Sequence, residues 1–283
     1  MTDIWVCGTC HSINEQRRGR CYKCGARQEV AATGEMATLR REQAIASRTV
    51  VAYRPAAALG LATSFFLLGL AVVNLAGIVQ TFGLSSFLDQ QLGVLEATGS
   101  IDEPAFLART EEMNRLGLAN LAVVLPALLF FAAWLSRVVS NVPALGGGIP
   151  STSPGRAFVN TLIPLVNLRT VPGMVQDVLY RLDPRGGGVF MVGAAWFGLV
   201  GSWIVSFLAG WYLDLRLTFD LFNAASLEEA VASFRTLLTL AVAIDVSTGA
   251  LIAIGAVVLI ALMIRIERRS RARDAEVRAL AGV

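Results

Sequence analysis

Long apolar stretches dominate the pattern of hydrophobic and polar positions along this chain. Four of them reach about 20 residues or more, the length that a helix needs to cross the hydrocarbon core of a bilayer. They cover residues 55–84, 116–135, 189–213 and 237–264. The pattern therefore predicts an all-α integral membrane protein with four transmembrane helices, forming one membrane domain over residues 55–264.

A fifth apolar stretch, residues 157–168, is too short to span a bilayer and contains Pro164. The residues after it are amphipathic, with valine and leucine recurring at helical spacing on one face. Pro172 suits the first turn of a helix there. We predict that residues 157–182 form an interfacial or re-entrant segment and not a fifth span.

The charged residues between the apolar stretches indicate the orientation of the chain. Lys and Arg number nine against five Asp and Glu in residues 1–54, two against six in 85–115, five against two in 136–188, two against four in 214–236, and six against three in the Arg-rich tail 265–283. Lys and Arg accumulate in short cytoplasmic loops. The alternation predicts a multi-pass protein of the cell membrane with both termini in the cytoplasm.

Composition supports a membrane protein and argues against a bulk nucleic-acid binder. Of the 283 residues, 55% are hydrophobic and 16% are charged, against roughly 25% charged in an ordinary soluble domain. The net charge is only +3. No constellation of catalytic residues is present, so we expect no enzymatic activity.

All four cysteines lie near the N-terminus, in two CxxC pairs ten residues apart. Cys7, Cys10, Cys21 and Cys24 match a structural zinc site, in which four thiolates enclose one ion. The alternative is covalent haem attachment at the CxxCH sequence that begins at Cys7. That reaction needs export from the cytoplasm, and it leaves the second pair without a role. We predict a zinc-folded module over residues 1–30, followed by a linker helix over residues 31–54.

The module resembles the RanBP2-type zinc finger over residues 3–27. Trp5, the four cysteines and Asn14 stand as W-x-C-x2-C-x3-N-x6-C-x2-C. The resemblance implies that Trp5 packs on a small ribbon and that Asn14 forms hydrogen bonds within the two knuckles.

What this finger binds stays open at the level of sequence. Arg17 and Arg18 stand where RNA-binding members of the family carry a pair of arginines for guanine, but Glu15 replaces the stacking aromatic residue. The Thr-Phe pair of ubiquitin-binding fingers is also absent. Together with Arg20, the two arginines form a basic loop suited to anionic lipid headgroups. A cytosolic protein partner is the next interpretation, and single-stranded RNA the weakest.

Small residues recur at every fourth position of the third apolar stretch, which lets a neighbouring helix approach closely. They are Ala194, Gly198, Ser202, Ser206 and Gly210, and Gly249 with Ala253 repeats the spacing in the fourth stretch. We expect packing within the bundle, with a homo-oligomer interface as the alternative. Trp134 and Trp211 stand at stretch ends and suit interfacial anchoring.

Polar residues inside the apolar stretches are candidates for function. Asp245 is the only acidic one, and we expect it near the outer surface. Asn74 and Asn120 could form hydrogen bonds between helices. Residues 226–229, SLEE, resemble a capping box that begins the fourth helix. A transporter or channel subunit, with Asp245 and Pro164 lining a path, is therefore an alternative function.

A second resemblance centres on the predicted cytoplasmic loop 136–188 and continues into the third apolar stretch. The segments that carry it are WLSRVVSNVPALGG, SPG at 153–155, LIPLVNL at 162–168 and the Trp-bearing span that follows. Together they look like the bacterial membrane family called domain of unknown function 4328, from about residue 130 to residue 211. The resemblance implies an integral membrane protein and supplies no activity. The glycine triplets 146–148 and 186–188 are expected to be flexible joints. The leading hypothesis is a membrane-anchored zinc finger that recruits a cytosolic partner to the bilayer.

Overall fold

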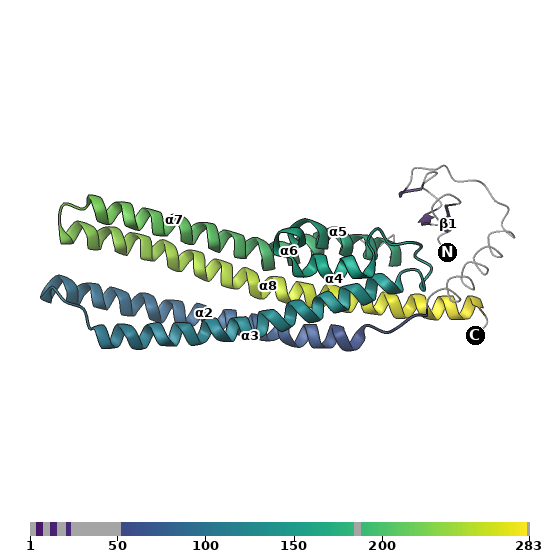
Figure 1. The fold of residues 1–283 in the computed structure, drawn as a ribbon, viewed down its shortest axis with the longest axis horizontal. Coiled ribbons are helices and arrows are strands. Elements are labelled where there is room, and N and C mark those ends of the chain that lie inside the picture. The colour runs from purple at the N-terminus through teal and green to yellow at the C-terminus, as the bar shows by residue number, and fades with distance from the viewer. Residues whose placement is uncertain (1–3, 8–11, 16–20, 24–51, 184–187, 282–283) are drawn as a thin grey trace. The chain divides into compact units, whose positions relative to one another are not determined.

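The structure of the protein is a computed structural model that describes residues 4–7, 12–15, 21–23, 52–183 and 188–281. In chain order its elements are β1 (Ile4–Val6), β2 (Ile13–Glu15), α2 (Ala57–Thr98), α3 (Glu103–Asn141), α4 (Pro154–Leu162), α5 (Pro164–Leu182), α6 (Val189–Trp196), the π-helical turn η1 (Phe197–Gly201), α7 (Ser202–Asn223) and α8 (Leu227–Ala281) (Figure 1). They form two compact units. Unit 1 comprises residues 1–64, 127–193 and 259–283, and unit 2 comprises residues 65–126 and 194–258.

Four helices are long and apolar enough to cross a membrane, which confirms the prediction of a multi-pass membrane protein. They are Ala57–Thr98, Glu103–Asn141, Val189–Asn223 and Leu227–Ala279. Their outward faces are strongly apolar. On α2 the exposed residues follow helical spacing, at Leu61, Phe65, Leu68, Val72, Leu75 and Val79. Such a continuous apolar surface is unusual in water and ordinary in lipid.

The helices extend beyond the predicted spans, so two segments treated as loops are mostly helical. Of residues 85–115, only 99–102 lie outside α2 and α3, and of residues 214–236 only 224–226 lie outside α7 and α8. Residues 85–98 contain no proline and include good helix formers such as Gln90, Gln91 and Glu96, so the helix continues through them as far as Gly99. Gly99 adopts φ of 72° and its N–H donates to Leu95 O at 2.9 Å. This left-handed cap ends α2.

The predicted capping box at the start of α8 is confirmed. Ser226 Oγ accepts a hydrogen bond from Glu229 N at 3.2 Å. The Glu229 carboxylate accepts in return from Ala225 N at 2.9 Å, one residue before the position that the motif specifies. From this start α8 continues to Ala281, so the Arg-rich tail is a helical extension of the fourth span.

Unit 2 contains backbone contacts between helices at small residues, as the ladder predicts. A Cβ atom at Gly198 would lie 2.7 Å from Gly255 Cα, and one at Gly255 would lie 2.8 Å from the Gly198 carbonyl carbon. Ser202 is buried one turn after Gly198 and its hydroxyl donates to the Gly198 carbonyl. Gly198 lies within η1, where the chain widens into a π-helical turn beside α8. The sequence indicated Gly198 but not Gly255. The contact joins two helices of the same chain.

Unit 1 is built around a core of large side chains. Trp134 and Leu135 of α3 are fully buried, as are Leu262 and Ile266 of α8. Trp134 stacks on Phe131, with the ring centroids 5.7 Å apart. The predicted interfacial role of Trp134 is therefore wrong. Its indole N–H donates to Glu267 Oε1 at 3.1 Å, so the polar end of the ring is satisfied inside the protein.

Residues 157–182 form two short helices and not one segment. The break falls at Ile163, which precedes Pro164 and has extended backbone angles of φ −90° and ψ 110°. A residue before proline avoids the helical region, and proline itself suits a helix start. Helix α5 thus begins at Pro164, and the expectation that Pro172 lies in a first turn is wrong. Pro172 lies inside α5, whose buried face includes Val171 and Val175.

The first glycine triplet is a tight turn and not a flexible joint. Gly146 and Gly148 have φ of 72° and 71°, in the left-handed region that favours glycine. A Cβ at Gly147 would lie 2.8 Å from a Val142 side-chain carbon. The buried Arg181 donates to Gly147 O at 2.8 Å and fixes the turn against α5. Of the second triplet, residues 186 and 187 lie outside the described residues.

Candidate functional site

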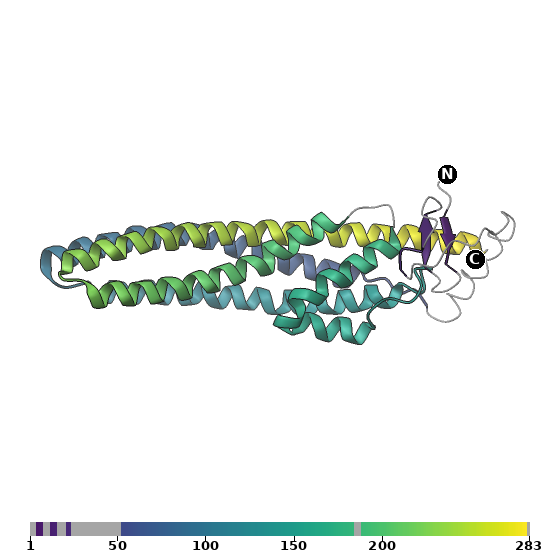
Figure 2. The same cartoon turned by 90° about the horizontal axis from the view of Figure 1, so that it is seen from above.

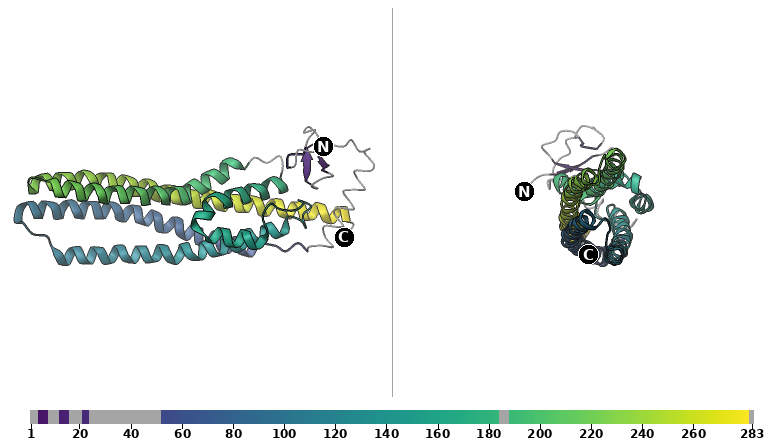
Figure 3. Two further views of the ribbon diagram at one scale, coloured as in Figure 1. Left: turned by 45° about the horizontal axis from the view of Figure 1, so that its top comes forward. Right: turned by 90° about the vertical axis from the view of Figure 1, so that its left-hand side faces the viewer.

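The cysteine module contains a small antiparallel hairpin in its first half (Figures 2 and 3). The register of β1 and β2 pairs Trp5 with Asn14. Side chains of a strand alternate between its two faces, and here Trp5, Cys7 and Asn14 are buried while Val6 and Ile13 are partly exposed. One face of the hairpin therefore carries the tryptophan, the first cysteine and the asparagine.

The Asn14 side chain links the hairpin to the segment of the second cysteine pair. Its amide nitrogen donates to Ser12 O at 2.7 Å, and its amide oxygen accepts from Tyr22 N at 2.9 Å. Both ends of the amide are thus used while the side chain is almost completely buried. A buried amide with both partners satisfied fixes the relative placement of the segments it connects.

Cys7 and Cys21 lie in one buried cluster with Trp5, although thirteen residues separate the two cysteines. Lys23 N donates to Cys21 Sγ at 3.4 Å. Cys7 N donates to Ser12 O at 2.9 Å, which closes the hairpin loop. The other two predicted ligands, Cys10 and Cys24, lie outside the described residues, as do Arg17, Arg18, Arg20 and residues 31–51 of the predicted linker helix. The last three residues of that predicted helix, 52–54, are described and are not helical. No group of three or more metal-binding side chains occurs within the described residues.

Tyr22 and Lys23 connect the cysteine module to the rest of unit 1. The Tyr22 and Tyr180 rings have centroids 4.2 Å apart, and Lys23 Nζ donates to Ile149 O at 3.0 Å. Burial raises the pKa of the Tyr22 phenol above its ordinary value of 10.0, and the Arg181 guanidinium opposes part of this shift. Sequence reasoning missed both contacts, because their partners lie more than 100 residues away in the chain.

A salt bridge on α5 stabilises the surface that Tyr22 and Lys23 contact. Asp177 accepts from Arg181 Nε at 2.8 Å. Its second carboxylate oxygen accepts from Ser151 N at 2.9 Å and from the Ser151 hydroxyl at 2.8 Å. The loop that carries Ile149 is therefore fixed to α5 by charged hydrogen bonds, which are stronger than neutral ones.

The three polar residues predicted inside the membrane line one cavity in unit 2. Asp245 of α8, Asn74 of α2 and Asn120 of α3 lie around a space of about 280 Å³, together with Ser206 of α7. Asn74 donates to Leu70 O at 2.9 Å, within its own helix. Within the described part of the chain, no hydrogen bond or ion pair is found for the Asp245 carboxylate. Pro164, proposed with Asp245 to line a path, belongs to unit 1.

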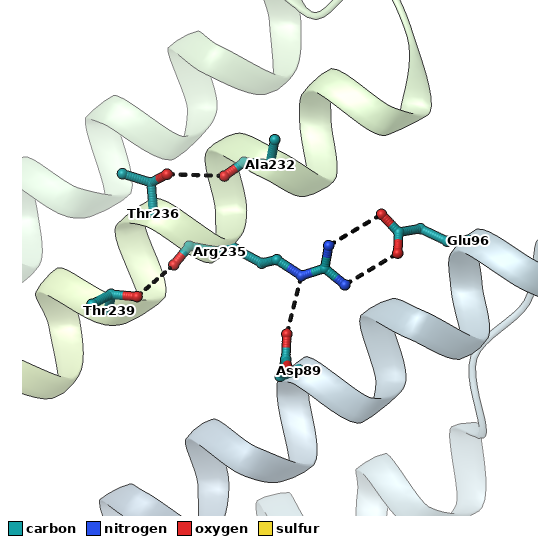
Figure 4. A network of polar contacts seen from close by, with 6 residues as sticks. All are labelled: Asp89, Glu96, Ala232, Arg235, Thr236 and Thr239. Carbon is teal, nitrogen blue, oxygen red and sulfur yellow. Dashed lines mark hydrogen bonds and ion pairs between the residues drawn. The ribbon is translucent and has the colours of Figure 1, made fainter.

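Near the helix connections of unit 2, an exposed ionic network joins α8 to α2 (Figure 4). Arg235 donates through Nε to Asp89 at 3.0 Å, and through its two terminal nitrogens to Glu96 at 3.3 and 3.1 Å. Paired hydrogen bonds of this kind fix both distance and direction. No local motif predicted this network, since Arg235 lies about 140 positions after its partners.

These features define a multi-pass α-helical membrane protein that carries a cysteine-containing hairpin before its first long helix. The family model described as Domain of unknown function (DUF4328) matches residues 105–269. Because the match covers more than half of the chain, the protein belongs to this family. The matched region includes nearly all of α3 and most of α8, and it leaves out the cysteine module and α2. No curated protein and no solved structure matches the chain.

Proposed function

We propose that the protein is a non-enzymatic membrane anchor whose N-terminal zinc finger recruits a cytosolic protein to the bilayer. One observation supports this most strongly. The Asn14 amide joins the two cysteine segments, and Cys7 and Cys21 share one buried cluster. Sequence patterns alone cannot bring these segments together in space.

The residues present fit a zinc ion. The module has about 25 residues, and the only buried cluster among its described residues consists of Trp5, Cys7 and Cys21. So few apolar groups cannot offset the conformational entropy of ordering the segment. A bound zinc ion would supply that folding energy. The backbone N–H of Lys23 donates to Cys21 Sγ, and hydrogen bonds of this kind help to orient the ligands of a metal ion. The roles of Trp5 and Asn14 also agree with those expected from the RanBP2-type resemblance.

The recruiting role follows from where this module sits in the chain. The charge pattern favours an orientation with both termini in the cytoplasm, and this orientation is part of the proposal. Tyr22 contacts α5 and Lys23 contacts the loop before α4, so these two residues attach the module to the rest of unit 1. We propose that Arg17, Arg18 and Arg20, which lie outside the described residues, contact the partner.

The test uses the full chain in lipid nanodiscs as bait for a cytosolic extract. We expect a protein that binds the wild type and is lost both after zinc chelation and in Cys21→Ser. Asp220→Asn, which changes an exposed ion pair in unit 2, is the matched control and should retain the partner. Recovery of the same proteins with and without zinc would contradict recruitment by the finger. Crosslinked RNA that is lost in Arg17→Ala would replace the protein partner by a single-stranded RNA.

A second candidate function is transport, and the cavity around Asp245 favours it. A carboxylate at membrane depth is costly unless it is hydrated or paired. Asn74, Asn120 and Ser206 provide polar neighbours from three other helices. We expect Asp245→Asn to abolish cation flux into proteoliposomes if the cavity belongs to a transport path, while Asp220→Asn leaves the flux unchanged. Equal flux in both variants and in empty liposomes would rule the path out.

A further inference from the structure

A cavity of about 720 Å³ lies in unit 1 between three segments of the chain. They are the residues that lead into α2, the last turns of α3 and the start of α4. The charged residues that line it are Arg54 and Arg137. Within the described part of the chain, no carboxylate lines this cavity. Two positively charged residues therefore line the same space, and the described residues of the lining supply no counter-charge.

The fold brings these two arginines together through a buried asparagine. Asn141, at the end of α3, accepts from Arg54 N at 3.1 Å and donates to Arg54 O at 2.7 Å. Arg137 lies one helical turn before Asn141. Like charges repel, so an anion in the shared cavity would favour the approach of the two side chains. The backbone of Arg54 is held in place by hydrogen bonds that are independent of its charge.

Arg137 differs from every comparable arginine in the described part of the chain. All other arginines there that are buried or half-buried have a carboxylate within ion-pair distance. They are Arg109, Arg181, Arg235, Arg265 and Arg273. Arg137 is half-buried and has no ion pair and no side-chain hydrogen bond within the described residues. Partial burial makes an acceptor for the N–H groups of a guanidinium favourable, because desolvation without one costs free energy.

The two serine hydroxyl groups of the lining already donate hydrogen bonds within the protein, so the arginines are the donors that remain for an anion. The Ser136 hydroxyl donates to Pro154 O at 2.9 Å, and the Ser140 hydroxyl donates to Arg137 O at 2.7 Å. Both protons serve to hold α4 and the end of α3. The two guanidinium groups, each a planar fork of N–H donors, are then the groups that can bind anionic oxygens. Such forks match the geometry of phosphate.

The position of the two arginines in the chain fits a membrane surface. Arg54 comes directly before the first apolar stretch, and Arg137 comes two residues after the end of the second. Phe158 of α4 also lines the cavity, and its neighbour Val159 is exposed. An apolar group next to a positively charged cavity suits a ligand with a phosphate head and a hydrocarbon tail.

We infer that the unit 1 cavity is a binding site for a phosphate group, held by Arg54 and Arg137. The group is carried by an anionic phospholipid or arrives as a free phosphate. This site is separate from the proposed zinc finger and does not depend on it, so one can fail without the other.

The test is native mass spectrometry of the full chain released from mild detergent, titrated with dioleoylphosphatidylglycerol. Dioleoylphosphatidylcholine, which carries no net charge, is the lipid control, and inorganic phosphate is the third probe. We expect Arg137→Gln and Arg54→Gln each to weaken phosphatidylglycerol binding about 10-fold or more, as expected for losing hydrogen bonds to a charged group. Arg137→Lys keeps the charge but loses the fork, so it should restore only part of the affinity. Arg169→Gln, an exposed arginine of α5, makes the same change of charge and should leave binding unchanged.

The outcomes separate the two sources of phosphate. Competition by millimolar inorganic phosphate supports a site for the free anion, and phosphatidylglycerol binding that phosphate does not displace supports a lipid site. Equal affinity for both lipids in the wild type, together with no binding of inorganic phosphate, would overturn the inference. The inference is also overturned if Arg54→Gln binds phosphatidylglycerol like the wild type. The Arg54 side chain is exposed, so this substitution is not expected to disturb folding. The inference fails as well if Arg169→Gln loses as much affinity as the two cavity variants.

Discussion

In unit 1 the space between helices is filled by large side chains such as Trp134 and Leu262, whereas in unit 2 helix backbones touch at Gly198 and Gly255. The buried apolar side chains are also concentrated in unit 1. In unit 2 they are few and mostly small, and the large apolar residues, such as Phe65 and Phe207, point outward. The two units therefore use different sources of stability.

The difference agrees with the physical chemistry of the two solvents. In lipid no hydrophobic effect drives helices together, so they associate through close van der Waals contact at small residues. In water, burial of large apolar side chains is the dominant favourable contribution to folding. The composition of unit 2 is typical of a bundle inside the bilayer. The core of unit 1 resembles that of a water-soluble domain, and the Arg-rich end of α8 belongs to it.

The largest effect should come from removing a core side chain of unit 1. Trp134→Ala would leave a large cavity next to Phe131 and remove the hydrogen bond to Glu267. We expect a loss of about 3–5 kcal/mol in the free energy of unfolding. Trp203→Ala removes an equally large side chain that is 59% exposed on α7 and should cost far less. Reversible unfolding in mild detergent measures both. Equal losses would mean that the two units do not differ in this way.

The next largest effect should come from adding a single methyl group in unit 2. Gly198→Ala places a Cβ 2.7 Å from Gly255 Cα, so the helices must move apart. Overpacking of this kind costs about 1–3 kcal/mol. At Gly210, on the same helix, a Cβ meets nothing within 4 Å. Gly210→Ala should be neutral or slightly stabilising, because alanine favours helix. A thermal midpoint that falls equally in both variants would contradict the close contact.

A smaller effect is expected from the exposed network that joins α8 to α2. Arg235→Gln removes the ion pairs to Asp89 and Glu96 (Figure 4). Exposed ion pairs contribute little and are screened by salt. We expect the thermal midpoint of the variant to fall less than that of Gly198→Ala, and the difference from the wild type to shrink in 1 M salt. A difference that salt leaves unchanged would show that Arg235 acts through packing.

The smallest effect concerns the pH dependence of unit 1. Burial, with a further contribution from the Glu267 carboxylate, raises the pKa of Tyr53 above its ordinary value of 10.0. The folded state then holds the phenol proton more tightly than the unfolded state, so this contribution to stability is complete below pH 10 and declines as the pH rises through the raised pKa. We expect the thermal midpoint to fall slightly more between pH 9 and 11 in the wild type than in Tyr53→Phe. Identical slopes would contradict the shift.

Much of the membrane domain could be predicted from the sequence because its signals are local. Apolar run length located the four helices, the spacing of small residues located Gly198, and the SLEE motif located the start of α8. Ile163 and Pro164 show where such reasoning falls short. Their effect on the backbone is local, but the sequence analysis placed the start of the helix at Pro172 and the structure places it at Pro164. The amphipathic pattern begins only near Pro172, and extending the helix back to Pro164 would require knowing what α5 packs against.

Long-range features could not be predicted. Trp134 at the end of an apolar stretch has the sequence signature of an interfacial anchor, and only the approach of Glu267 on α8 explains its burial. The convergence of Arg54 with Arg137 depends on Asn141, which carries no motif. Asp245, Asn74 and Asn120 were each identified as candidates, but the sequence could not show that they line one cavity.

The central proposal is that thiolates of the N-terminal module hold zinc. Its most direct test is the metal content of the purified full chain, combined with X-ray absorption at the zinc edge. We predict about one zinc per chain in an all-sulfur environment, lost in Cys7→Ser and Cys21→Ser and retained in Gly210→Ala. A chain that purifies folded, without zinc and with a haem absorption band, would contradict the proposal.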